Sequence, residues 1–306
     1  MNDLMKNKNY VIEQIGNILV DQTRPMKERF RALFTLKNIG GETSIHCIER
    51  CFDDPSVLLK HECAYCLGQM GDSFAVPKLE SILKNTAEDP IVRHEAGEAL
   101  AAIGKESSLE ILQNYIDDPC VEVSETCQLA VQKMKHNTFM ESKVSRNPYY
   151  SVDPAPPYPL DQYSTTELES ILLDENRSLY DRYRAMFSLR NMESNSAALS
   201  LAKGLDCGSA LYRHEIAYIL GQMQKENTVQ QLAKLLCDET QHEMVRHECA
   251  EALGSIATEE CMEILARYLT DERTVVRESC EVALDMCDYE NNKEFQYANA
   301  LLKISS

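Results

Sequence analysis

Hydrophobic residues recur along the chain at the spacing of one helix face, and residues 91–103 illustrate the pattern. The apolar positions in this segment are Val92, Ala96, Ala99, Leu100 and Ile103. In a helix that turns by about 100° per residue, these side chains fall within an arc of about 100°. The pattern therefore predicts an amphipathic helix, with His94 nearly opposite the apolar stripe and Glu95 at its edge.

Residues 59–70 have the same register. Their apolar stripe consists of Leu59, Cys63, Cys66, Leu67 and Met70, and His61 lies opposite it. The register carries over to two later segments, which contain His214 and His247. We therefore predict that the four histidines lie outside the core, on the exposed face of helices that line the concave side of a helical array.

The chain repeats itself at an offset of 153 residues. Eight of the ten residues of HECAYCLGQM, which begins at His61, recur in HEIAYILGQM, which begins at His214. Seven of the twelve residues of RHEAGEALAAIG, which begins at Arg93, recur in RHECAEALGSIA, which begins at Arg246. Roughly, residues 24–134 and 177–287 therefore form one duplicated unit that aligns without a gap.

Each half contains a shorter repeat of 31–33 residues. The equivalent positions in the first half are Phe30, His61, His94 and Glu125, and those in the second half are Tyr183, His214, His247 and Glu278. A period of this length with helical patterning indicates helical hairpins stacked as a solenoid. The prediction is an all-α protein of eight repeats in two pseudosymmetric halves, residues 1–140 and 166–306.

Proline residues mark the turns and the junction between the halves. Asp-Asp-Pro at 53–55 and Glu-Asp-Pro at 88–90 are expected to supply a turn and the first residue of the second helix of a hairpin. The segment 141–165 holds five of the ten prolines and is predicted to be an extended, semi-rigid linker. This linker either closes over a site between the halves or acts as a passive tether.

Composition narrows the class of protein. The net charge is −18 and no basic cluster is present, which argues against nucleic-acid binding. The acidity favours cationic partners, although solubility alone explains it equally well. No apolar run approaches the length of a membrane helix, and the first residues lack a signal-peptide core. We expect a soluble cytoplasmic protein with no membrane partner.

The twelve cysteines are scattered through helical stretches, as expected for thiols in a reducing compartment. Cys63 and Cys66 form a CxxC pair, but both align with isoleucines 153 residues later, so we interpret them as core residues. The pair that begins at His242 stands five residues before His247, one more than the spacing of zinc proteases. We interpret His242 as a solvated residue at a helix start.

Four His-Glu pairs occupy one repeated position, namely His61-Glu62, His94-Glu95, His214-Glu215 and His247-Glu248. The flanking repeats carry other residues there, so the fold does not require the pair; an inherited surface dipeptide is the alternative. Imidazole and carboxylate donors suit iron, manganese or zinc. Each half offers two histidines and two glutamates for one metal ion. Halves that face each other would bring two ions together, as in di-iron carboxylate proteins.

The four pairs, set in KHECAYCLGQM and RHEAGEALAAIG, resemble the deoxyhypusine hydroxylase family over nearly the whole chain. The resemblance implies HEAT-like repeats and a non-haem di-iron monooxygenase that uses two iron ions (Fe2+/Fe3+) and O2. The electron donor is external and is not identified by the sequence. The implied protein substrate is eukaryotic translation initiation factor five A. Its deoxyhypusine, an aminobutyl-extended lysine, becomes hypusine.

All eight residues of the four pairs carry over from the family as expected metal-site residues, although one glutamate per half is an alternative contact for the substrate's ammonium groups. Glu98 and Glu251 follow the second histidine of each half by one helical turn, and Tyr65 and Tyr218 follow the first. Because a polyamine-like side chain needs carboxylates, we expect Glu98 and Glu251 to bind the substrate, with Tyr65 and Tyr218 on the same face. Ordinary solvated residues are the alternative.

Three other functions compete with this interpretation. A HEAT-like adaptor without catalysis explains the solenoid and the acidity, but not the selective placement of the His-Glu pairs. A bilin lyase built on similar repeats has no use for four such pairs. A di-metal hydrolase would use the same kind of ligands, and its colourless zinc would distinguish it from a ferric pair that absorbs visible light.

Overall fold

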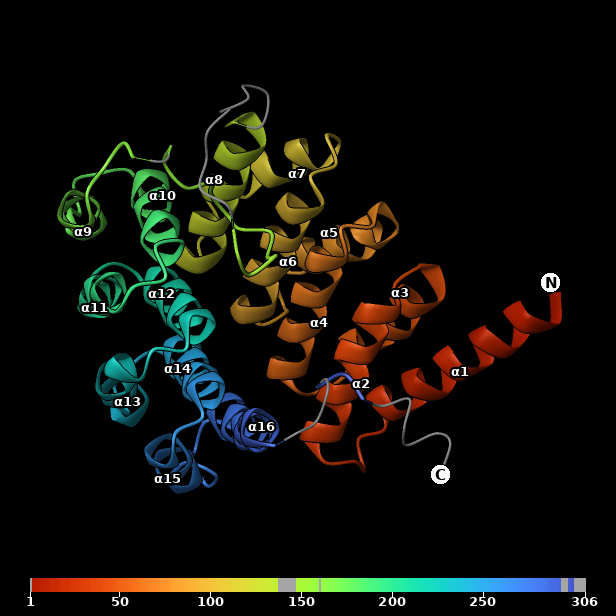
Figure 1. Cartoon of the computed structure of the whole chain (residues 1–306). Coiled ribbons are helices and arrows are strands. Elements are labelled where there is room, and N and C mark those ends of the chain that lie inside the picture. The colour runs from red at the N-terminus through yellow and green to blue at the C-terminus, as the bar shows by residue number, and fades with distance from the viewer. Residues whose placement is uncertain (1, 137–146, 160, 293–296, 300–306) are drawn as a thin grey trace.

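The computed structural model describes residues 2–136, 147–159, 161–292 and 297–299. Within these ranges the chain forms sixteen α-helices, which alternate between an outer and an inner layer (Figure 1). The outer helices are α1 (Asn2–Val20), α3 (Glu42–Glu49), α5 (Val76–Lys84), α7 (Ser108–Asn114), α9 (Thr165–Leu173), α11 (Asn195–Lys203), α13 (Val229–Cys237) and α15 (Glu259–Arg267). The inner helices are α2 (Met26–Ile39), α4 (Val57–Met70), α6 (Pro90–Ile103), α8 (Val121–His136), α10 (Leu179–Arg190), α12 (Ala210–Met223), α14 (Glu243–Ile256) and α16 (Thr274–Asn291). The predicted all-α helical solenoid is confirmed.

Corresponding helices of the two halves have matching bounds. Helices α4 and α12 begin and end at positions 153 residues apart, and so do α6 and α14. The short 3₁₀ turns Ser73–Ala75 and Glu226–Thr228 are related by the same offset. The internal duplication of the sequence therefore produces two copies of one helical stack.

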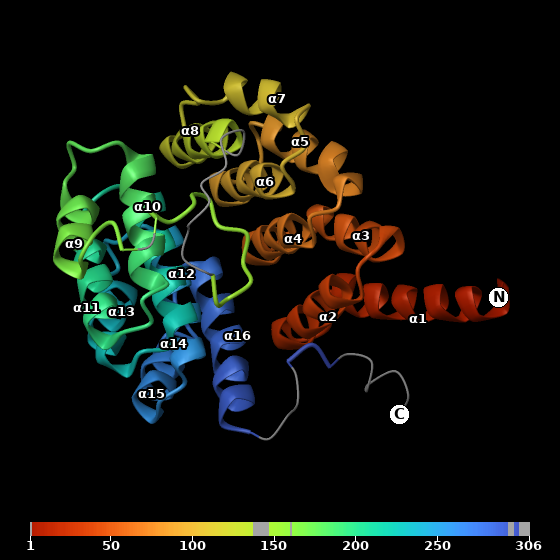
Figure 2. The same cartoon turned by 45° about the horizontal axis from the view of Figure 1, so that its top comes forward.

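The inner helices of one half face the inner helices of the other (Figures 1 and 2). Helix α2 packs against α16 at one end of the molecule, and α8 packs against α10 and α12 at the other. The two curved stacks thus close on each other and cover their inner faces. Among the described residues, no helix combines the length and the apolar character needed to span a membrane.

The apolar stripes form the core, as their spacing predicts. Val92, Ala96 and Leu100 of α6 are buried, and so are Cys63 and Cys66 of α4. All twelve cysteines are free thiols. Burial raises the pKa of the Cys63 and Cys66 thiols well above the ordinary value, so neither is a reactive thiolate. The interpretation of the CxxC pair as core residues is confirmed.

One of the two predicted helix starts is displaced. Pro90 is the first residue of α6, and the side chain of Asp89 caps that helix by accepting from the Ile91 N–H at 2.9 Å. In the preceding repeat, Pro55 lies before the cap, because Ser56 caps α4 by accepting from the Leu59 N–H at 3.0 Å. A serine hydroxyl satisfies a free N–H at a helix start, which moves the start beyond the proline.

The described part of the linker, residues 147–159, touches both halves. The Val152 N–H donates to Gln69 Oε1 of α4 at 2.9 Å, and Asp153 forms an ion pair with Arg190 of α10 at 2.6 Å. The Arg184 guanidinium donates to the Pro156 carbonyl at 3.2 Å. Of the two roles considered for the linker, these contacts favour a cover over one side of the space between the halves.

Candidate metal centre

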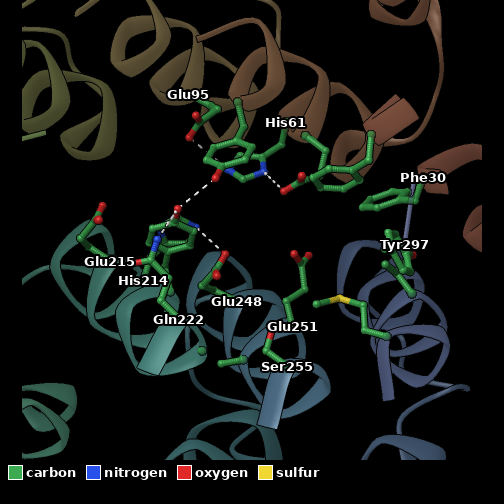
Figure 3. A pocket seen from close by; sticks show the side chains of 18 of the residues that line it. Phe30, His61, Glu95, His214, Glu215, Gln222, Glu248, Glu251, Ser255 and Tyr297 are labelled. Atoms are coloured by element: carbon green, nitrogen blue, oxygen red, sulfur yellow. Dashed lines mark hydrogen bonds and ion pairs between the residues drawn. The ribbon is translucent and has the colours of Figure 1, made fainter. Parts of the chain in front are cut away.

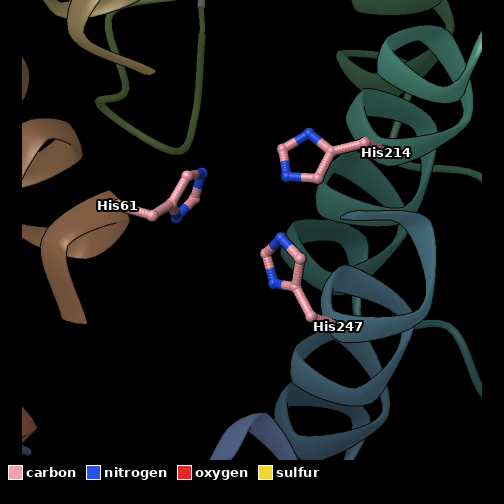
Figure 4. A group of neighbouring side chains, drawn as sticks. All are labelled: His61, His214 and His247. Atoms are coloured by element: carbon pink, nitrogen blue, oxygen red, sulfur yellow. The ribbon is translucent and has the colours of Figure 1, made fainter. Parts of the chain in front are cut away.

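The four His-Glu pairs occupy one position on four inner helices and meet between the halves. The first pair lies on α4, the second on α6, the third on α12 and the fourth on α14. The imidazoles of His61, His214 and His247 lie close together in the space between the two stacks (Figure 4). The predicted location opposite the apolar stripe is therefore correct, but the predicted exposure is wrong. The histidines are at most 6% exposed because the facing half covers them.

The imidazole rings form a single cluster that spans both halves. Ring centroids of His61 and His247 lie 5.2 Å apart, those of His61 and His94 5.5 Å, and those of His214 and His247 5.3 Å. Two groups bring ligand atoms within 4.8 Å of one another: His61 with His214 and His247, and His61 with His94 and Glu95. His61 belongs to both groups, so the ligands of the two halves are adjacent.

The imidazole nitrogens of the cluster have no hydrogen-bond partner among the described residues. Both ring nitrogens are buried without such a partner in all four histidines, namely His61, His94, His214 and His247. The same holds for Glu215 Oε1. Buried polar atoms are almost always hydrogen-bonded, and leaving one unsatisfied costs about 1–3 kcal/mol. A bound metal ion would satisfy these nitrogens, and the donor set fits that role.

Carboxylate oxygens lie 3.2–3.6 Å from four of these nitrogens without the geometry of a hydrogen bond. Glu95 on α6 lies 3.4 Å from His61 Nε2 on α4, and the equivalent Glu248 lies 3.2 Å from His214 Nε2. In each half, one glutamate therefore crosses to the histidine of the neighbouring helix. Glu62 instead approaches a histidine on its own helix, α4: it lies 3.6 Å from His61 Nδ1. The fourth contact is that of Glu251 with His247 Nδ1, at 3.5 Å.

Burial and mutual repulsion set the charges of the cluster. Burial, then the neighbouring imidazoles, hold the pKa of His94, His214 and His247 well below the ordinary value, so these rings are neutral near neutral pH. Burial also lowers the pKa of His61, but the carboxylates beside it outweigh that effect and raise its pKa. Burial and the nearby carboxylates raise the pKa of Glu248 well above its usual range. A cation among these groups would relieve the repulsion.

A cavity of about 330 Å³ adjoins the cluster (Figure 3). Its lining includes both tyrosines and both glutamates predicted to contact a substrate, namely Tyr65, Tyr218, Glu98 and Glu251. The Tyr65 and Tyr218 hydroxyls are hydrogen-bonded to each other at 2.9 Å across the two halves. Burial raises the pKa of both glutamates to about 8. The structure thus brings these four residues into one cavity with six of the eight residues of the His-Glu pairs.

Several residues that line the cavity are not among those that the sequence pattern indicated. Phe30 and Phe34 of α2, Met286 of α16 and Tyr297 form an apolar wall of the cavity. Phe30 occupies the position of the His-Glu pair in the first repeat, which was a usable signal. Tyr297 follows the duplicated unit, so no periodicity could have indicated it.

His242 lies outside the cluster, as predicted. It is the residue before α14, and its Nδ1 accepts from the Met244 N–H at 3.2 Å. The ring is 43% exposed and faces Glu122 of α8 at 3.7 Å. The interpretation of His242 as a solvated residue at a helix start is confirmed.

A buried imidazole and carboxylate cluster between two facing solenoid halves defines a helical-repeat protein with a site suited to metal ions. The family model of HEAT repeats matches residues 46–132 and 198–285. The chain is 56% identical to deoxyhypusine hydroxylase of Bos taurus over 297 residues, which cover 96% of this chain and 97% of the relative. It is 53% identical to the Homo sapiens enzyme over 290 residues, which cover 95% of each chain.

A solved structure of human deoxyhypusine hydroxylase in complex with glycerol has the same fold. It superposes with a TM-score of 0.89 at 52% sequence identity, over 93% of this chain and 98% of that one. The chain belongs to the deoxyhypusine hydroxylase family. The family expected from the His-Glu pairs is therefore confirmed.

Proposed function

We propose that this chain is a deoxyhypusine monooxygenase that uses O2 and two iron ions to hydroxylate the deoxyhypusine side chain of eukaryotic translation initiation factor five A. The observation that carries the proposal is the set of buried imidazole nitrogens that form no hydrogen bond with any described residue and lie beside a cavity lined by carboxylates. Membership of the family supports the reaction.

The proposed ligands of one ion are His61, His94 and Glu95, whose donor atoms lie within 4.8 Å of one another. By the pseudosymmetry of the halves, the ligands of the other ion are His214, His247 and Glu248. The short approach of Glu248 to His214 Nε2, at 3.2 Å, supports this second set. Glu62 and Glu215 remain as further ligands or as contacts for the substrate's ammonium groups.

When bound, two iron ions supply the activation of O2 that oxidation of an unactivated C–H bond requires. The chain's own residues prepare the site. Three neutral imidazoles offer lone pairs without first losing a proton. Both stacks enclose the cluster and limit the access of water, which protects a reactive centre from side reactions. The cavity carboxylates, such as Glu251, attract a cationic side chain and hold it beside the histidines.

The test is a hydroxylation assay with the deoxyhypusine form of the translation factor, O2 and a reductant. We expect the substrate to gain the mass of one oxygen atom. The His61→Ala/His214→Ala double variant should form no product. A His46→Ala/His242→Ala variant is the matched control, because it removes two histidines outside the cluster. Product formed equally by both variants, or by neither variant nor the native protein, would overturn the proposal.

A further inference from the structure

The two glutamines of the repeated LGQM segments, Gln69 and Gln222, hold the linker between them. Gln69 Oε1 accepts from the Val152 N–H at 2.9 Å, and the Gln222 side-chain amide donates to the Ser151 hydroxyl at 3.3 Å. The two glutamines stand 153 residues apart, so they are equivalent in the duplication. Gln222 also lines the cavity and donates to the Tyr218 hydroxyl at 2.9 Å (Figure 3). Among the contacts of the described residues, Gln69 makes no such bond to a tyrosine of the cavity.

Arg190 fixes the orientation of the Gln222 amide, since its guanidinium donates to Gln222 Oε1 at 3.1 Å. Arginine carries no acceptor, so the amide oxygen must face Arg190 and the amide nitrogen must face Tyr218. Arg190 is itself held by a buried ion pair with Asp153 of the linker, at 2.6 Å. The equivalent residue of the first half is Lys37, whose ammonium lies over two aromatic rings of the cavity wall instead. The linker therefore sets the direction of one hydrogen bond at the tyrosine pair.

The tyrosine pair has more hydroxyl protons than hydrogen bonds that use them. Tyr65 and Tyr218 carry one hydroxyl proton each, and the bond between their oxygens uses one of the two. The bond from Gln222 occupies an acceptor position of Tyr218 and uses no hydroxyl proton. Burial raises the pKa of both hydroxyls well above the ordinary tyrosine value, so both keep their protons near neutral pH. Whichever tyrosine donates to the other, one hydroxyl proton at the cavity has no acceptor among the described residues.

A hydroxyl proton of this kind requires an acceptor on the bound side chain. The ammonium groups of the proposed substrate are donors, like that of lysine, so they cannot accept it. Hydroxylation adds an acceptor to this side chain, because a hydroxyl oxygen has two lone pairs.

We propose that the pair of Tyr65 and Tyr218 donates a hydrogen bond to the oxygen atom that the reaction adds to the side chain, and that Gln222 is the positioning residue for this donor. The inference rests on the proposed function and deepens it, because it assigns to this chain a group that recognises the hydroxylated side chain. The linker acts on the cavity through Arg190 and Gln222.

The test compares two peptides, one carrying deoxyhypusine and one carrying hypusine, in calorimetry on the iron-loaded protein without O2 or reductant. The measured quantity is the ratio of the two dissociation constants, in which effects common to both peptides cancel. In Gln222→Glu, one carboxylate oxygen still accepts from Arg190 and the other accepts from Tyr218, so both hydroxyl protons are engaged. We expect the preference for the hypusine peptide to fall by about threefold to tenfold, the worth of one hydrogen bond between neutral groups.

Gln69→Glu is the matched control, because the same change at the equivalent position keeps the acceptor for the Val152 N–H. It should leave the ratio at the native value. The Tyr65→Phe/Tyr218→Phe double variant removes both hydroxyl protons and should lower the preference as much as Gln222→Glu does.

A native ratio in a folded Gln222→Glu protein or in the folded double variant would overturn this inference alone. An equal fall in Gln69→Glu would also overturn it, because the loss would then not depend on the tyrosine pair. A native protein that binds both peptides no better than a peptide with an unmodified lysine would overturn the proposed function as well.

Discussion

The Ser56 hydroxyl donates a hydrogen bond to Glu278 Oε2 across the two halves, at 2.7 Å. The duplication repeats this contact, because Ser209 donates to Glu125 at 2.5 Å. Each serine also caps an inner helix, α4 or α12, by accepting from a backbone N–H. Both glutamates stand at the position that carries His-Glu in the central repeats. One repeated position therefore supplies the candidate metal ligands in the middle of each half and ties the halves together at its end.

Removal of this hydroxyl should cost more than an ordinary helix cap. Ser56→Ala is expected to lower the free energy of unfolding by about 2 kcal/mol, since it removes the cap of α4 and a hydrogen bond to a carboxylate. Ser178→Ala is the control, because this exposed serine caps α10 and bonds only within its own turn. It should cost about 1 kcal/mol. Equal losses in urea unfolding would show that the contact between the halves contributes nothing.

Buried arginine–aspartate pairs join successive repeats, and their loss should be severe. Arg93 bonds to Asp118 at 2.6 Å with both side chains buried. Asp118→Asn should lower the free energy of unfolding by about 3 kcal/mol, because it leaves the Arg93 charge buried without a counter-ion. The exposed pair of Lys234 and Asp206 provides the control. Asp206→Asn should change stability by less than about 0.5 kcal/mol.

The cost of Asp118→Asn should depend on pH. Burial alone would raise the pKa of Asp118. The hydrogen bond and ion pair with Arg93 outweigh burial and hold this pKa below its ordinary value. The carboxylate therefore stabilises the fold fully above the ordinary aspartate pKa of about 3.9, and this advantage disappears as the pH falls through the lower folded-state value. Urea unfolding across the acid range should show the native protein and Asp118→Asn converging in stability. A constant difference would contradict the assignment.

A tight contact between α4 and α6 positions two of the candidate ligands. A Cβ atom added to Gly68 would lie 2.8 Å from Ala99 Cα, so Gly68→Ala must push the helices apart. We expect a loss of about 1–3 kcal/mol of stability and weaker iron binding, because these helices carry His61 and His94. Gly97→Ala is the control, since its added Cβ would meet the Thr126 side chain at 3.4 Å. Iron binding by Gly68→Ala equal to that of the control would show that this helix spacing does not set the site.

Much of the fold and the site follows from periodicity. The offset of 153 residues reveals the duplication, and the apolar stripes locate the inner helices. The same stripes place His61 and His94 on the face away from the core. These features are local, because each one depends on the spacing of residues within a single helix or a single repeat.

The remaining features depend on how the two halves meet, which no single repeat encodes. The histidines are buried because another copy of the stack covers them, so the exposure expected from one helix was wrong. Tyr297 lies beyond the duplicated unit, so no repeat could have predicted its place.

We propose that the buried imidazole cluster holds two iron ions. The most direct test is the metal content and visible absorption of the purified native protein, beside the His61→Ala/His214→Ala variant. We expect two irons per chain and a visible band in the oxidised native protein, with both lost in a variant that remains folded. A folded native protein that binds no metal, or that binds only colourless zinc without forming product, would contradict it.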